Sequence, residues 1–203
     1  MLGVSTVKKS LLILELTSEK IEKKSEGWLL FELIKILWNE SRVEFPNSVG
    51  KTNFLDALKN TEHRYVHVSS HGYSGVRGTS LQVQRKRNGR FMKIKPEDFK
   101  GLWENHKKTP KLIVLSACDA GHQDMIKALA KEGVKHVIAP LHTTFWDYTA
   151  AFSILFYKSL LGGGHSPWVS YRKAQLGMDA AFPDSTGKWR FYEWGEYIPL
   201  IKE

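Results

Sequence analysis

The sequence contains a single cysteine, Cys118, among its 203 residues. One thiol cannot build an intrachain disulfide framework, and it also excludes a zinc site made from several thiolates. Proteins that need no disulfides suit a reducing compartment, so we expect a cytoplasmic protein.

Long apolar runs are also lacking. No stretch approaches the roughly 20 residues that a membrane-spanning helix needs, so we expect no membrane association. The run Leu11–Leu14, which follows two lysines, superficially resembles a secretory signal. It is too short for a signal core, it is broken by Glu15, and no small-residue cleavage site follows it. We therefore expect no secretory signal.

Several cofactor and metal motifs are missing. There is no Walker A motif and no G-x-G-x-x-G, and the glycines of 162–164 follow a predicted helix, where they indicate its C-terminal loop. No spacing of His, Asp and Glu defines a metal site, so we expect neither a metal nor a cofactor. Internal repeats and linker-like stretches are absent as well, and a single domain over residues 1–203 is the simplest organisation.

Acidic residues are fewer than basic ones, 21 against 30, which gives a net charge of +9. Such an excess is compatible with a polyanion as partner. The positive charge is spread along the chain except for one concentration between Arg85 and Lys95. This stretch is either the solvated tip of a hairpin or a nucleic-acid surface, and the sequence favours the hairpin tip.

Short apolar runs alternate with longer amphipathic stretches, and this order predicts an α/β fold with a doubly wound, mainly parallel sheet flanked by helices. Alternation around Asn88-Gly89 predicts a β-hairpin inserted after the third strand, over 80–84 and 90–94, preceded by a glycine-rich loop over 72–78. The predicted strands are 9–16, 42–45, 65–70, 112–117, 135–140 and 189–201, and the predicted helices are 19–40, 52–60, 96–105, 124–132, 148–161 and 168–181.

Two of the predicted strands end in side chains that can do chemistry. YVHVSSHG finishes at His71 and KLIVLSACDAG leads into Cys118. Chemistry in open α/β sheets gathers at the carboxyl ends of strands, so an imidazole and a thiol would meet there. The imidazole can take the proton of the thiol and later protonate a leaving amine. The alternative is that Cys118 is a small buried hydrophobe.

Backbone N–H groups of Gly72 and Cys118 are the candidate donors for an oxyanion, because Gly72 lets the main chain come close to a scissile carbonyl. The remaining histidines are less informative. His67 alternates with valines on a strand and is expected in the core or as a partner of the backbone. We expect structural roles for His122 and His142 near the strand ends, and the alternative is that one of them lines the cleft.

Several motifs occur in a fixed order: YVHVSSHG, LIVLSACDAG, VKHVIAPLHTTFWDYTAAFSILFYKSLLGGG and YRKAQLGM, then the closing WRFYEWGEYIPLI. This order resembles the CHAT domain of the caspase-like clan, which also includes separases, metacaspases and clostripain-like peptidases. The resemblance implies a cysteine endopeptidase with His71 as general base and acid and Cys118 as nucleophile. It further implies a switchable effector in bacterial antiviral defence or programmed cell death. The sequence departs from the family's pattern at 141–150 and at Trp168, near the expected substrate pocket.

Two carboxylates lie close to the expected substrate pocket, Asp119 beside the cysteine and Asp147 beyond the fifth strand. A partly desolvated carboxylate favours an arginine side chain, so cleavage after a basic residue is expected. Each has a plainer alternative. Asp119 is suited to a turn, and Asp147 to the N-terminus of a helix.

The expected partners are a protein or peptide substrate and an activator, either a partner chain or a nucleotide-derived ligand. A rim of aromatic and basic residues is the candidate ligand site, with cations for phosphates and aromatic rings for a base: Tyr73, Arg77, Arg85, Arg87 and Trp146. The alternative function is a catalytically idle module that binds nucleic acid or a nucleotide messenger. The presence of both candidate catalytic residues favours the enzyme.

Overall fold

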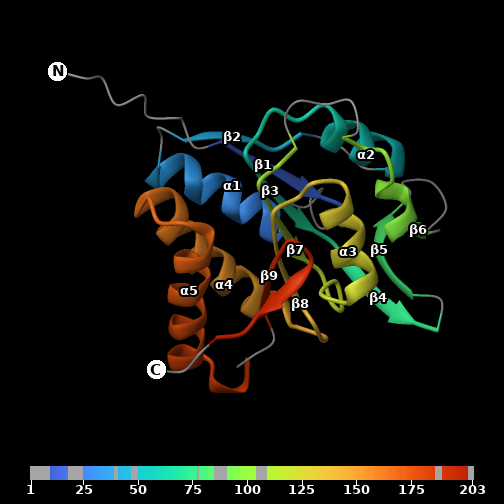
Figure 1. Ribbon diagram of the computed structural model, residues 1–203. Helices are drawn as coiled ribbons and strands as arrows, with labels where there is room; N and C mark the ends of the chain where they lie inside the picture. The colour runs from blue at the N-terminus through green and yellow to red at the C-terminus, as the bar shows by residue number, and fades with distance from the viewer. Residues whose placement is uncertain are drawn as a thin grey trace.

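A seven-stranded sheet forms the centre of the fold, in the order β10-β9-β8-β7-β3-β1-β2 (Figure 1). The computed structural model describes residues 10–17, 25–38, 41–46, 50–76, 78–84, 91–103, 109–185 and 189–200. The strands of the sheet are β1 (Ser10–Glu15), β2 (Arg42–Glu44), β3 (Tyr65–Ser69), β7 (Leu112–Ser116), β8 (His136–Pro140), β9 (Trp189–Glu193) and β10 (Glu196–Ile198).

The five strands β2, β1, β3, β7 and β8 run parallel. Every residue of β3 and β7 is buried, as expected for central strands of a sheet that is covered on both faces. The predicted α/β fold with a mainly parallel sheet is therefore confirmed.

The C-terminal segment differs from the prediction of one strand over 189–201. It forms an antiparallel hairpin of β9 and β10, and β9 also pairs antiparallel with β8. The turn consists of Trp194 and Gly195, with φ angles of 51° and 88°. Two consecutive residues with positive φ make the tight turn that matches the twist of a hairpin.

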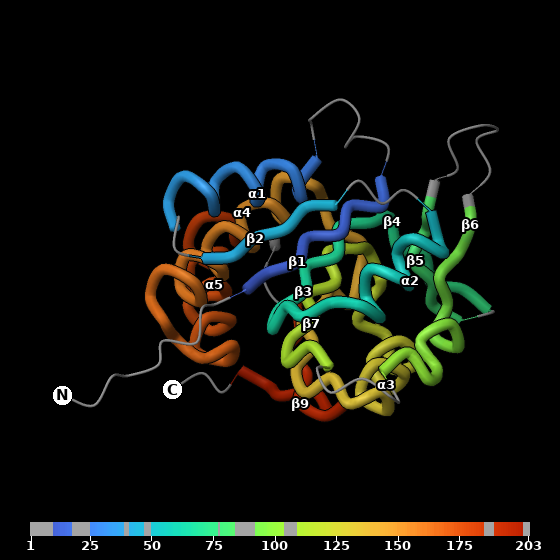
Figure 2. Tube along the Cα trace, turned by 90° about the horizontal axis from the view of Figure 1, so that it is seen from above, coloured from blue at the N-terminus to red at the C-terminus, as the bar shows by residue number. Residues whose placement is uncertain are grey.

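Helices cover both faces of the sheet (Figures 1 and 2). On one face α1, α4 and α5 pack over a core rich in aromatic side chains, and α2 and α3 cover the other face over a mainly aliphatic core. The helical segments are α1 (Glu26–Leu37), α2 (Lys51–Lys59), η2 (Pro96–Phe99), α3 (Gln123–Lys131), α4 (Trp146–Tyr157), η3 (Lys158–Gly162), α5 (Pro167–Ala181) and η4 (Pro183–Ser185).

Two helices end differently from the prediction. The stretch expected to be helical over 96–105 forms only the 3₁₀ turn η2, and 104–105 lie outside the described residues. The helix expected over 148–161 changes at Lys158 into the π-helical turn η3, where the N–H of Gly163 bonds the carbonyl of Lys158 at 3.0 Å. Such π turns widen a helix locally and are frequent at functional sites.

A second, three-stranded antiparallel sheet follows the strand that leads to His71. It consists of β4 (His71–Gly75), β5 (Gly78–Gln84) and β6 (Phe91–Ile94). The predicted hairpin is confirmed in β5 and β6, although its turn at Asn88-Gly89 lies outside the described residues. The predicted glycine-rich loop over 72–78 instead contributes β4, because its backbone pairs with β5.

Candidate active site

His71 and Cys118 occupy equivalent positions after neighbouring strands. Ser69 of β3 pairs with Ser116 of β7 in parallel register, and His71 and Cys118 each lie two residues further on. The carboxyl ends of neighbouring parallel strands lie at the same edge of a sheet, so His71 and Cys118 both lie at that edge. Both line one pocket of about 310 Å³.

Most of the residues that line the pocket have polar side chains. Besides His71 and Cys118 it is bordered by the carboxylate residue Glu26, by Ala117 and Trp146, and by a set of small hydroxyl side chains: Thr17, Ser25, Ser69, Ser70, Ser116, Thr144 and Thr149. Cys118 is half-buried, and its Sγ lies 3.6 Å from the carbonyl oxygen of Thr144. The thiol is therefore accessible from the pocket and is not sealed in the core.

Gly72 brings the main chains of the two segments together. A β-carbon built on Gly72 would overlap the carbonyl oxygen of Cys118 and would lie 2.8 Å from its carbonyl carbon. Only a residue without a side chain fits here. The glycine thereby fixes His71, its neighbour in sequence, against the turn that carries Cys118. The roles of the Gly72 and Cys118 N–H groups as oxyanion donors stay a prediction.

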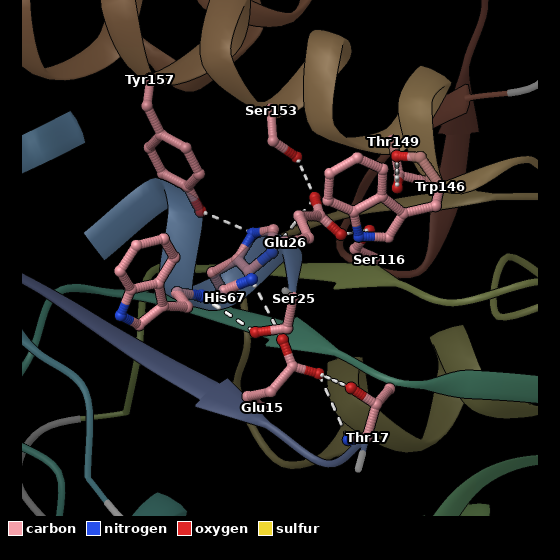
Figure 3. Close-up of polar contacts among 12 residues, drawn as sticks. Glu15, Thr17, Ser25, Glu26, His67, Ser116, Trp146, Thr149, Ser153 and Tyr157 are labelled. Carbon is pink, nitrogen blue, oxygen red and sulfur yellow. Dashed lines mark hydrogen bonds and ion pairs between the residues drawn. The ribbon is translucent and has the colours of Figure 1, made fainter. Parts of the chain in front are cut away.

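Glu26 supplies a buried carboxylate to the same pocket. It is the first residue of α1 and only 2% exposed. The hydroxyl of Ser116 donates to its Oε2 at 2.5 Å, and the hydroxyl of Ser153 on α4 donates to its Oε1 at 2.7 Å (Figure 3). Three elements that are distant in sequence thus meet at this carboxylate.

His67 and Tyr157 extend this cluster into the core (Figure 3). Nε2 of His67 lies 3.5 Å from Oε1 of Glu26, a distance of electrostatic attraction rather than a good hydrogen bond, and its Nδ1 lies 3.2 Å from the Tyr157 hydroxyl. The expected core position of His67 is confirmed, since it is 0% exposed.

The pKa of the Glu26 carboxyl lies below its ordinary value of 4.5. Burial acts to raise the pKa, but electrostatic attraction to His67 and hydrogen bonds from Ser116 and Ser153 outweigh burial. The carboxyl group of Glu26, a residue that lines the pocket, is therefore charged at neutral pH. A buried charge of this kind is common at functional sites.

A second buried carboxylate, Glu15, lies at the end of β1 and is 0% exposed. It accepts the hydroxyl of Thr17 at 2.5 Å and the N–H of Gly27 at 3.0 Å. Here burial dominates and raises the pKa above 4.5, although the hydrogen bonds from Thr17 and Gly27 oppose the increase. Glu15 joins the end of β1 to the first turn of α1 and so positions Glu26.

The two aspartates expected at the substrate pocket do not line it. Asp119 lies in the turn after Cys118 with a φ of 57°, a left-handed conformation that aspartate tolerates. Asp147 is exposed in the first turn of α4, where its Oδ1 accepts the N–H of Tyr148 at 2.9 Å. Both fit the plainer structural alternatives, and their contribution to substrate binding stays a prediction.

The expected ligand rim is described only in part. Trp146 is 53% exposed and lines the pocket beside Cys118. Tyr73 is 49% exposed, with the ammonium of Lys93 4.5 Å from its ring centre. Arg77, Arg85 and Arg87 lie outside the described residues.

Sequence reasoning missed Glu26. A helix predicted over 19–40 places Glu26 in an ordinary interior turn, whereas α1 begins at this residue with Ser25 as its cap. The signal was present in the pair Ser25-Glu26, because serine caps a helix and an acidic residue favours its first turn. A helix that starts there, after the first strand, brings its N-terminus to the edge of the sheet where His71 and Cys118 lie.

Within the described residues, no group of three or more His, Cys, Asp or Glu side chains is arranged to hold a metal ion. None of the helices described is both long enough and apolar enough to cross a membrane.

Comparison with known families decides the relationship. The family model of the CHAT domain matches residues 27–200, which is most of the chain. The chain belongs to the CHAT domain family. A search of curated proteins gave no significant match.

This CHAT protein also resembles a solved structure. The crystal structure of the Arg-specific cysteine proteinase gingipain R matches it with a TM-score of 0.53 and 11% sequence identity. The match covers 85% of this chain and 42% of the gingipain chain, so this protein corresponds to less than half of that enzyme. At this level of identity the comparison shows a shared, caspase-like fold.

Proposed function

We propose that the protein is a cysteine endopeptidase with a dyad of His71 and Cys118. The observation that carries the proposal is the equivalent placement of these two residues, each two positions beyond the paired serines of β3 and β7 and both lining one pocket. Membership of a family related to cysteine peptidases supports the same chemistry.

In this mechanism the imidazole of His71 takes the proton of the Cys118 thiol. The thiolate attacks the scissile carbonyl carbon, and the negative oxygen accepts hydrogen bonds from the N–H groups of Gly72 and Cys118. His71 then gives its proton to the leaving amine as the peptide bond breaks. Water, activated by His71, hydrolyses the thioester and restores the thiol.

The substrate residue before the cleaved bond is basic in this proposal. The support is the charged Glu26 carboxylate within the pocket that contains Cys118. A carboxylate removed from water pairs with a guanidinium or ammonium group. A neutral side chain does not balance its charge, and an acidic side chain is repelled by it. Asp119 and Asp147 remain candidates for substrate contacts nearer the surface.

The biological role proposed with this activity is that of a switchable effector in bacterial defence or programmed cell death, activated by a partner chain or a nucleotide-derived ligand. Its support is the resemblance to CHAT-type peptidases. High activity of the purified protein with no added component would contradict the need for an activator.

The test compares the native protein with Cys118→Ala and His71→Ala on a positional peptide library, with and without candidate activators. We expect turnover after Arg or Lys in the native protein and none in either variant. Turnover only after Asp would contradict the basic preference, and activity retained in Cys118→Ala would contradict the thiol mechanism. The Cys118→Ala protein must unfold with the native midpoint, so that loss of activity reports chemistry and not folding.

A further inference from the structure

A second pocket, of about 460 Å³, lies at the opposite end of α4 from the one beside Cys118. Trp146 and Thr149 in the first turns of α4 line the catalytic pocket, whereas Leu155 near its end and Ser159 in η3 line the second one. This second pocket therefore has no part in the proposed peptide cleavage. We call it the η3 pocket.

The η3 pocket is bordered by positive charge. Two exposed lysines, Lys158 and Lys173, line it together with His165, and none of its described lining residues is acidic. Nζ of Lys173 donates to Nε2 of His165 at 2.8 Å, which holds both groups on one side of the pocket. Such a cluster favours an anion with several acceptor oxygens.

A buried hydroxyl in the same wall points independently to a ligand. Ser159 is 8% exposed, and its Oγ has no hydrogen-bond partner among the residues that the structure describes. The carbonyl oxygen of Ser159 accepts a hydrogen bond from the N–H of His165 at 3.3 Å, so the group that lacks a described partner is the side-chain hydroxyl. Buried hydroxyl groups are nearly always paired, and an unpaired one that borders a cavity calls for an explanation. A ligand oxygen in the η3 pocket would provide the missing partner.

The remaining wall is apolar and includes an indole. The half-buried Trp38, just after α1, lines the pocket, and a β-carbon built on Gly162 would lie 2.5 Å from its Nε1. The glycine therefore lets the η3 turn lie directly against the indole edge. A pocket of 460 Å³ is much larger than one phosphate group, and Trp38 with Leu155 suits a planar, poorly hydrated group beside the charged one.

We propose that the η3 pocket binds a nucleotide. Lys158 and Lys173 contact the phosphates, the hydroxyl of Ser159 donates to a phosphate oxygen, and the base lies beside Trp38. This site differs from the aromatic and basic rim expected from the sequence. Binding here does not require peptidase activity, so either proposal can fail without the other.

The test is calorimetric titration of the full chain with ATP, AMP, adenosine and inorganic phosphate. We expect saturable binding of ATP and AMP that is tighter than binding of adenosine or phosphate. Changing both lysines, Lys158→Gln with Lys173→Gln, is expected to weaken ATP binding by about tenfold or more, since charge-assisted hydrogen bonds are the strong ones.

The matched control is Lys127→Gln with Lys131→Gln, which removes the same charge from exposed positions on α3, where Glu97 and Glu132 also line the surface. This control should bind ATP as the native protein does. Equal weakening in both double variants would show unspecific attraction to a basic protein and would overturn the proposal.

Ser159→Ala separates a ligand contact from a structural role. We expect it to weaken ATP binding and to leave the stability of the free protein equal or higher, because it removes an unpaired buried group. Three further results would overturn the nucleotide proposal: no saturable binding of ATP or AMP, inorganic phosphate binding as tightly as ATP, or unchanged ATP binding in Ser159→Ala.

Discussion

The main chain of Gly72 lies against the main chain of Cys118, and a side chain at position 72 would overlap the Cys118 carbonyl group. This contact joins the segment that carries the proposed base to the turn that carries the proposed nucleophile. The spacing of His71 and Cys118 therefore depends on a glycine at which no side chain fits.

Replacing Gly72 with alanine should separate the two segments. We expect Gly72→Ala to lower the free energy of unfolding by about 1–3 kcal/mol, the cost of an overpacked site, because the overlap is with backbone that cannot move aside easily. Displacing the dyad by about 1 Å would lower kcat roughly a hundredfold. Chemical denaturation and peptidase assays measure the two effects.

The control for this variant is Gly177→Ala on α5. A β-carbon there would meet the end of the Leu155 side chain at 2.9 Å, a group that can rotate away. This change should leave peptidase activity near native. A fully active Gly72→Ala protein would contradict the role given to the glycine.

Glu26→Gln should remove most of the preference for a basic residue. Gln keeps the shape and can still accept a hydrogen bond, but it loses the charge. We expect kcat/KM for an arginine substrate to fall about 10- to 100-fold, the value of one charge-assisted hydrogen bond, with little change for a neutral substrate. Asp147→Asn, at an exposed carboxylate outside the pocket, is the control. Loss of the preference in that variant instead would assign the specificity to Asp147.

The preference for arginine should not depend on pH near neutrality. The pKa of Glu26 lies below 4.5, so its carboxylate is charged above that pH and is neutralised only below it. We expect the ratio of kcat/KM for arginine and neutral substrates to stay constant from about pH 8 to about pH 5, because the Glu26 carboxylate keeps its charge over this range. A ratio that falls between pH 7 and pH 6 would contradict a Glu26 contact.

Glu15 should affect stability in the opposite direction to an ordinary paired carboxylate. Its pKa is raised above 4.5 by burial, so the charged form is disfavoured in the folded state, and stability is lost as the pH rises through the folded pKa. The free energy of unfolding of Glu15→Gln, relative to the native protein, should therefore increase between about pH 4 and about pH 7.

Glu44 provides the matched comparison for Glu15. Hydrogen bonds from Arg42 and the nearby imidazole of His63, whose Nε2 lies 3.1 Å from Oε2 of Glu44, lower its pKa, and its side chain is 47% exposed. For Glu44→Gln the relative stability should fall slightly over the same pH range, because exposed pairs contribute little. Denaturation curves at several pH values measure whether the stability of each variant, relative to the native protein, rises or falls with pH. A relative stability of Glu15→Gln that does not change with pH would contradict the raised pKa of Glu15.

Tyr157→Phe should destabilise the protein although it leaves the pocket surface intact. Within the described part of the chain, the variant removes the one hydroxyl that contacts Nδ1 of the fully buried His67. We expect a loss of about 1–3 kcal/mol in the free energy of unfolding, the cost of an unsatisfied buried polar group. Tyr197→Phe, at a residue that is 39% exposed, is the control and should change the stability by less than about 0.5 kcal/mol. Equal stabilities would show that His67 finds another partner.

The sequence alone determined the parallel part of the central sheet and the ends of the two strands that precede His71 and Cys118. Unbroken apolar runs before His71 and Cys118 predicted buried parallel strands, and the carboxyl ends of neighbouring parallel strands must lie at one edge. The placement of both residues at one pocket follows from these local patterns, and so does the hairpin formed by β5 and β6.

Only the tertiary structure decided what surrounds the two residues. Glu26 accepts hydrogen bonds from Ser116 and Ser153, which are 90 and 127 positions away in the sequence, and no local pattern encodes such pairs. The turn at Trp194 and the π turn at Lys158 likewise depend on how the flanking segments pack. Apolar periodicity in the sequence indicates which face of a helix or strand is buried. The hydrogen-bond partners of the buried polar groups depend instead on contacts between residues that are distant in the sequence.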